Sequence, residues 1–206
     1  MAVRFTTIEK EAHAEQIINK SRFISHVFRA DSREEADEAI KMVRAEYKDA
    51  SHNVPAFVIG DKMQLQWGSD DGEPSGTAGA PIVQMLVKEG LTNLVMVVTR
   101  YYGGINLGTG GLVRAYTGTA KMALDLAGRH EVKDIRELEI SLDYSLLDRL
   151  KNMEKSSPFE IKNINYSEKV QIVLDYEPEF DVYIKRALED LCSGMPDIRN
   201  CVDKIY

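Results

Sequence analysis

The clearest hydrophobic pattern lies in the last third of the chain, where apolar residues occupy every second position from Leu138 to Tyr144. This period of two is typical of a half-buried strand. Ser145 is then a candidate N-cap of a helix that ends before Pro158. Pro178 opens a second predicted helix, and Gly194 is its expected C-cap. Residues 159–166 and 169–176 read as a hairpin, and 198–206 as a last strand. The order βαββαβ predicts a ferredoxin-like domain with two helices on one face of an antiparallel sheet.

The pattern before residue 128 mixes helices and strands. Ser32 and Glu35 have the spacing of a capping box ahead of an amphipathic helix. Strands are predicted over 22–28, 54–59 and 94–99, and helices from Pro81 to about Glu89 and from Leu112 to Ala127. The whole chain is therefore expected to be α+β and to have two domains.

Glycine placement and charge indicate where the chain divides. Thirteen of the 14 glycines lie at or before Gly128, and a polar segment over 129–133 is expected to link domains 1–128 and 129–206. The net charge of -7 splits unevenly: 14 basic and 16 acidic residues before 129 give -2, and 12 and 17 after it give -5. This charge disfavours general binding to nucleic acid or anionic lipid.

The apolar segments and the cysteines indicate where in the cell the protein is expected. The first 20 residues lack the apolar core of a secretion signal, and no apolar run is long enough to span a bilayer. Cys192 and Cys201 are too few for a disulfide framework and are expected to be free thiols, acting as buried apolar residues. We expect a cytoplasmic protein with no membrane partner, and no metal or cofactor is predicted.

Two glycine-rich stretches, 68–79 and 103–111, each precede a predicted helix. Such a loop can hold a phosphate at a helix N-terminus, but neither G-x-G-x-x-G nor a P-loop occurs. Two interpretations stay open: a bare anion site using Arg100 and Arg114, or loops that pack tightly for structural reasons.

Chemically capable side chains gather in and beside these stretches. Asp70, Asp71 and Glu73 could ligate Mg²⁺ or act as an acid/base pair, although the same residues are ordinary in a solvated turn. His52 has no nucleophile motif nearby, and Tyr102 with its neighbour Tyr101 could form a recognition surface. No catalytic residue is assigned.

The sequences Asp70-Asp71-Gly72-Glu73-Pro74-Ser75-Gly76-Thr77-Ala78-Gly79, Arg100-Tyr101-Tyr102-Gly103-Gly104 and Leu107-Gly108-Thr109-Gly110-Gly111-Leu112-Val113-Arg114-Ala115-Tyr116 resemble the IMPACT family and its bacterial YigZ-like members. Lys20-Ser21-Arg22-Phe23 and His52-Asn53 also fit this resemblance, which covers about 15–128.

The resemblance implies two folds and a link to translation. The N-terminal domain is expected to share the fold of domain 2 of a small-subunit ribosomal protein. The C-terminal domain is expected to resemble the last domain of elongation factor G. Eukaryotic members of the family regulate translation initiation through protein binding. Many bacterial members have a cysteine two residues after the histidine, where this chain has Val54, so a thiol nucleophile is not expected.

The leading hypothesis is a non-enzymatic binding protein with a protein or ribosome-associated partner in translation. Its binding surface is expected to combine residues of both glycine-rich stretches with their neighbours: Arg22, His52, Asp70, Asp71, Glu73, Arg100, Tyr101, Tyr102, Gly103, Gly104, Gly108, Gly110, Gly111 and Arg114. The alternative is a metal-assisted hydrolase or transferase acting on a phosphorylated or anionic small molecule. RNA contact is expected only through the N-terminal domain, because acidic residues occupy the predicted outer face of the C-terminal sheet.

Overall fold

The computed structural model describes residues 3–205. Contacts divide the chain into a first unit, Arg4–Glu131, and a second unit that contains residues 132–205 together with Val3. Each unit has its own sheet and its own buried core. The chain is thus a mixed α+β protein, as the sequence pattern predicts.

The first unit is built on a five-stranded sheet in which every neighbouring pair is antiparallel. Its strands, in spatial order, are β2 (Ala12–Ile18), β3 (Ser21–Arg29), β6 (Leu94–Tyr101), β4 (His52–Ile59) and β5 (Leu65–Gly68). The central strand β6 is buried from Leu94 to Arg100. Its continuous apolar run follows because helices cover both faces of the sheet.

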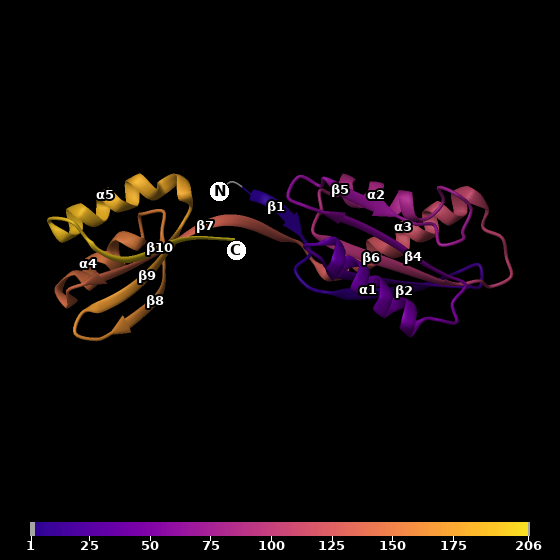
Figure 1. Ribbon diagram of the computed structural model, residues 1–206, viewed down its shortest axis with the longest axis horizontal. Coiled ribbons are helices and arrows are strands. Elements are labelled where there is room, and N and C mark those ends of the chain that lie inside the picture. Colours follow the sequence, from indigo (N-terminus) through magenta and orange to yellow (C-terminus); the bar gives the residue numbers. More distant parts are fainter. Residues whose placement is uncertain (1–2, 206) are drawn as a thin grey trace. The chain divides into compact units, whose positions relative to one another are not determined.

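Three helices cover this sheet, one on one face and two on the other (Figure 1). They are α1 (Arg33–Glu46), α2 (Gly79–Lys88) and α3 (Gly108–Ala127). Helix α1 packs against Phe57 and Val97, whereas α2 and α3 pack against side chains such as Met96. The predicted cap is present: the Ser32 hydroxyl accepts the Glu35 N–H, and the Glu35 carboxylate accepts the Asp31 N–H.

The second unit has the predicted βαββαβ order. Its elements are β7 (His130–Leu142), α4 (Tyr144–Glu154), β8 (Glu160–Tyr166), β9 (Val170–Tyr176), the 3₁₀ turn η1 (Pro178–Phe180), α5 (Asp181–Cys192) and β10 (Asp197–Ile205). The strand order is β10-β7-β9-β8, and β1 (Val3–Thr7) also pairs with β7. Leu138, Ile172, Leu150 and Leu188 are among the fully buried residues between this sheet and its two helices.

Several local predictions are wrong. Residues 130–133 begin β7 instead of forming a polar link, and Tyr144 begins α4, whose N-cap is Asp143 and not Ser145. The left-handed residue that ends α5 is Ser193, with φ of 53°, and not Gly194. In each case backbone hydrogen bonds determine where the strand or helix begins or ends, and side-chain periodicity does not.

Burial also differs from the sequence pattern at four positions. Cys201 is exposed on β10, and Cys192 is half-buried, with its thiol pKa raised by burial. The period of two places Ser141 and Asp175 on the outer face of the second sheet, but both are buried. Strands β1, β2 and β5 have no counterpart in the predicted elements. None of the helices within residues 3–205 is long and apolar enough to cross a membrane.

Candidate functional site

The first glycine-rich stretch is a loop that closes on the Asp70 carboxylate. The carboxylate accepts backbone N–H groups from Gly76 at 2.8 Å, Ala78 at 3.0 Å and Gly79 at 2.9 Å. Burial alone would raise the pKa of Asp70, but these three hydrogen bonds lower it overall. Since Gly79 begins α2, Asp70 holds the loop against the N-terminus of that helix. Asp70 therefore supports the loop, and its carboxylate has little remaining capacity to accept hydrogen bonds from a ligand.

Asp71 connects the loop to β4 and orients His52. Its carboxylate accepts the Asn53 N–H at 2.7 Å and the Arg44 guanidinium at 2.8 Å. Its backbone carbonyl lies 2.8 Å from Nδ1 of His52. A carbonyl can only accept, so Nδ1–H donates this bond and Nε2 is the nitrogen left for other contacts. Nε2 lies 3.8 Å from Oε1 of Glu73.

Glu73 and Arg100 form a buried ion pair at the base of the site. Arg100 Nη1 donates to Oε1 of Glu73 at 2.7 Å, and the two side chains are only 5% and 3% exposed. The Tyr116 hydroxyl donates to the same oxygen, also at 2.7 Å. Burial, together with this bond to a carboxylate, raises the pKa of Tyr116 far above its ordinary value, so the phenol stays protonated.

Arg100 is held on its other sides by β3 and by aromatic rings. Its Nη2 donates to the Ser21 hydroxyl at 3.2 Å, and its guanidinium carbon lies 5.3 Å from the Phe23 ring centre and 5.2 Å from that of Tyr102. Its Nε is buried and has no hydrogen-bond partner within residues 3–205. The Arg100 charge is therefore balanced by Glu73 and screened from solvent by Tyr102.

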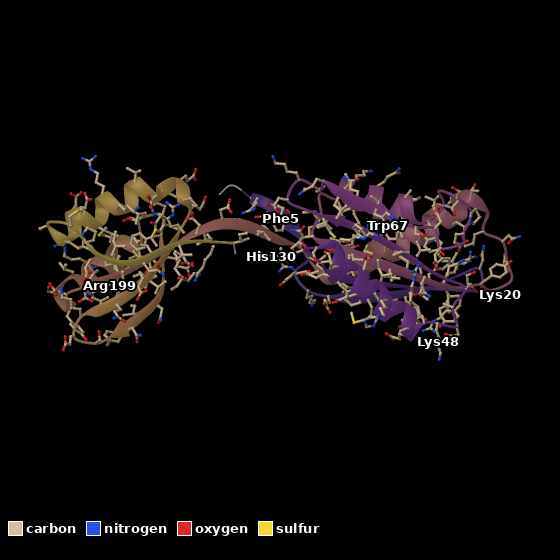
Figure 2. The ribbon with its side chains drawn as sticks, viewed as in Figure 1. Phe5, Lys20, Lys48, Trp67, His130 and Arg199 are labelled. Atoms are coloured by element: carbon tan, nitrogen blue, oxygen red, sulfur yellow. The ribbon has the colours of Figure 1, made fainter. Side chains whose placement is uncertain are left out.

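The second glycine-rich stretch approaches the β2–β3 turn, where Lys20 is labelled in Figure 2. A Cβ on Gly103 would lie 2.1 Å from the Lys20 backbone carbonyl, so only glycine fits this approach. The Gly103 N–H donates to the Ser21 hydroxyl at 3.1 Å. The sequence pattern predicts that residues 108–111 precede the helix. In the structure α3 begins at Gly108, so these residues form its first turn.

A cleft of about 470 Å³ lies between the two glycine-rich stretches. It is lined by His52, Glu73 and Arg100, together with Tyr102, Asn106 and the first turn of α3. Tyr102 is 48% exposed, and its hydroxyl donates to the Asn106 side chain at 3.1 Å. The first turn of α3 has no acidic residue and no side-chain cap, so its backbone N–H groups give the cleft a positive end.

Of the 14 residues predicted for this surface, five line the cleft. The cleft is lined by His52, Glu73, Arg100, Tyr102 and Gly108. Other predicted residues support it from within the two stretches and the helix turn: Asp70, Asp71, Gly103, Gly104, Gly110 and Gly111.

Three predicted residues point elsewhere. Arg22 pairs with Glu15 at 2.8 Å, and the Tyr101 hydroxyl donates to Asp49 at 2.9 Å. Arg114 is exposed on α3 and does not line the cleft. Two residues of the site are absent from the predicted surface: Tyr116, which donates to Glu73, and Asn106, which accepts from Tyr102. A phenol at a fully buried helix position was the available signal, since a buried hydroxyl needs a partner.

Comparison with known proteins identifies the class to which this fold and cleft belong. The model of the Impact N-terminal domain matches residues 19–124, which contain both glycine-rich stretches. Residues 140–194 match a second model, described as a domain of unknown function (DUF1949). The two matched regions lie in the first and second units respectively. The chain thus has the domain composition of an Impact-type protein.

Relatives establish the family. The chain is 38% identical to IMPACT family member YvyE of Bacillus subtilis, covering 95% of this chain and 90% of that protein. It is 40% identical to IMPACT family member YigZ of Escherichia coli, covering 72% and 74%. A solved structure titled as that of a hypothetical protein is 33% identical, covers 94% of this chain and 95% of that one, and has a TM-score of 0.60. The chain belongs to the IMPACT family.

Proposed function

We propose that this chain is a non-enzymatic binding protein linked to translation, and that its partner contacts the cleft between the two glycine-rich stretches. The observation that carries this proposal is the state of the three loop carboxylates. Asp70, Asp71 and Glu73 all accept hydrogen bonds from the fold, while Tyr102 and the first turn of α3 remain open to a partner. The cleft is thus better supplied for recognition than for acid/base chemistry.

The link to translation rests on the family. A protein of Caenorhabditis elegans named Protein IMPACT homolog is 29% identical over 96 residues, which is 43% of this chain and 37% of that protein. The resemblance implies that such eukaryotic members act on translation initiation through protein binding. We infer a corresponding partner here, either a protein of the translation machinery or a ribosome-associated factor in the cytoplasm.

The alternative of a metal-assisted hydrolase or transferase has less support. A metal ion would need free oxygen ligands, and each loop carboxylate would first have to give up hydrogen bonds to the fold. Within residues 3–205 no cluster of three His, Cys, Asp or Glu side chains has the geometry to hold a metal. RNA contact is proposed only for the first unit, since Glu137, Glu139 and Glu160 gather on one face of the second sheet.

Co-sedimentation tests the proposal. Cell extract containing the tagged full-length chain is fractionated at low and high salt, and fractions are probed for ribosomal subunits and translation factors. Wild-type chain is expected to migrate with one of these at low salt. Tyr102→Ala should reduce co-migration by about five-fold or more, because exposed aromatic side chains at the centre of a binding site carry much of the binding energy.

Tyr183→Ala is the matched control. Tyr183 is 52% exposed, close to the 48% of Tyr102, and lies on α5 in the second unit. It should co-migrate as wild type does. Wild-type chain that never co-migrates would remove the link to translation, and equal losses in the two variants would remove the cleft as the contact site.

A further inference from the structure

A second cavity, of about 370 Å³, lies entirely within the second unit. Its walls are mostly apolar and include Ile135 of β7, Pro158, Phe159 and the aromatic ring of Tyr176. A cavity of this size and character can take a small ligand or one side chain of a partner. Neither the cleft of the first unit nor the proposed function involves it.

One lining residue, Asp175 of β9, is a buried carboxylate with an unused hydrogen-bonding atom. Asp175 is 7% exposed, and its Oδ1 is buried with no partner anywhere in residues 3–205. A buried carboxylate without a partner is costly, because the charge has lost its water and gained nothing in exchange. Burial raises the pKa of Asp175 above its ordinary value.

The charged groups around Asp175 leave it as the excess negative charge. In the sheet it lies directly opposite Glu137 of β7 and Glu160 of β8. Glu137 is paired with Lys204 of β10, and Glu160 is paired with Lys162 at 3.0 Å. Glu177 also lines the cavity, and no Arg does. Lys162 lines the cavity as well. The two lysines thus pair Glu137 and Glu160, whereas Oδ1 of Asp175 has no hydrogen-bond partner within residues 3–205.

We propose that this cavity binds an organic cation, an ammonium or guanidinium group on a short alkyl chain, which donates a hydrogen bond to Asp175. The apolar walls would hold the alkyl chain, and Phe159 and Tyr176 offer ring faces or edges beside it. The cation can come from a free alkylamine or from a lysine or arginine side chain of a protein partner. Both sources present the same chemistry to Asp175.

Amide NMR of the ¹⁵N-labelled full-length chain tests this inference. n-Butylammonium chloride should cause saturable shifts at the amides of Ile135, Phe159, Asp175 and Tyr176. n-Butanol, which has the same shape without charge, should bind about ten-fold more weakly or worse, because hydrogen bonds to charged groups are the stronger ones. The blocked peptide acetyl-Gly-Lys-Gly-amide tests the protein-borne source, and saturable binding of either cation supports the inference.

Two variants and a pH series separate the outcomes. Asp175→Asn keeps the shape of the side chain and should lose the n-butylammonium effect, whereas Asp190→Asn, an exposed carboxylate of α5, should behave as wild type. In the wild-type chain, binding should weaken as the pH falls through the raised pKa of Asp175. This second measurement does not depend on the variant folding. Absence of saturable shifts with both cations, equal affinity in Asp175→Asn, or pH-independent binding would overturn the inference.

Discussion

Glu73 is the residue on which the interior of the cleft most depends. A single carboxylate oxygen accepts from both Arg100 and Tyr116, and His52 Nε2 is 3.8 Å away. A buried ion pair adds little compared with apolar packing, but removal of one partner leaves the other charge buried and unpaired. The positions of Arg100 and Tyr116 relative to the first glycine-rich stretch therefore depend on this oxygen.

Glu73→Gln is expected to lower the free energy of unfolding of the first unit by about 3 to 5 kcal/mol, since it leaves the Arg100 charge without its counterion. The measurement is urea denaturation followed by the fluorescence of Trp67. This residue is the one tryptophan in the sequence and stacks on Phe57 in the first unit at 5.4 Å.

Glu15→Gln provides a matched comparison at the surface. Glu15 pairs with Arg22 at 2.8 Å, but both side chains are more than 40% exposed. Its loss should leave the free energy of unfolding nearly unchanged, because solvent screens an exposed ion pair. Similar losses in the two variants would show that the Glu73 pair does not organise the cleft.

The sequence indicated the neighbourhood of the cleft better than the role of each residue. The glycine-rich stretches pointed to the correct loops, and Asp70 and Asp71 behave much as turn residues do. Pairing across the sheet decides the rest: His52 of β4 lies opposite Arg100 of β6. Neither periodicity nor spacing contains that register, so the Arg100–Glu73–Tyr116 cluster could not be derived from the sequence.

At the scale of elements, the main surprise is a helix that begins inside a glycine-rich stretch. Glycine disfavours helix, so the sequence pattern places the start of α3 near Leu112, four residues after its actual start at Gly108. Burial of Leu112, Ala115 and Tyr116 against the sheet stabilises the helix regardless. Tertiary packing, not intrinsic propensity, determines the first turn of α3.

Three alanine substitutions in the second glycine-rich stretch should therefore have different effects on the free energy of unfolding: two should lower it and one should raise it. Gly103→Ala should be the most destabilising, because its Cβ would meet the Lys20 backbone at 2.1 Å. Gly104→Ala should cost about 1 to 2 kcal/mol, because φ is +81° in otherwise open space. Gly110→Ala should stabilise by up to about 1 kcal/mol, because only the mobile end of Arg114 lies near and helix propensity improves.

Thermal unfolding followed by Trp67 fluorescence gives the ranking. The order Gly110→Ala, wild type, Gly104→Ala, Gly103→Ala from most to least stable is expected. A destabilised Gly110→Ala would mean that the first turn of α3 needs glycine for a reason other than packing or backbone angle.

At the scale of the whole molecule, the two units differ in the interactions that stabilise them. The first has a buried core on each face of its sheet, whereas the second has a single core between its sheet and two helices. In the second unit Asp181, at the start of α5, joins Arg136 of β7 at 3.1 Å and Tyr176 of β9 at 2.9 Å, and also contacts Lys185. Burial opposes ionisation of Asp181, but these hydrogen bonds lower its pKa to about 2.

Asp181→Asn should destabilise the second unit by about 1 to 2 kcal/mol near neutral pH, after allowance for partial solvent screening. A lowered carboxyl pKa gives stability that is present above the ordinary value of 3.8 and is lost as the pH falls towards 2. The difference from wild type should thus shrink over that range. Amide hydrogen exchange in β9 at neutral pH and far-ultraviolet circular dichroism in acid measure it.

Asp190→Asn serves as the comparison, since Asp190 is exposed on the same helix. The Trp67 unfolding transition should be unchanged in both variants, because Trp67 belongs to the first unit. A pH-independent loss in Asp181→Asn would show that packing, and not the carboxylate charge, is what this residue contributes.

The closure of the first loop on Asp70 also restricts how its length can vary. Three backbone N–H groups, from Gly76, Ala78 and Gly79, reach one carboxylate six to nine residues earlier in the chain. An insertion or deletion between Gly72 and Ser75 would move all three donors at once and detach the loop from the start of α2. At an exposed position of this loop such as Ser75, a change of side chain should therefore be tolerated better than a change of loop length.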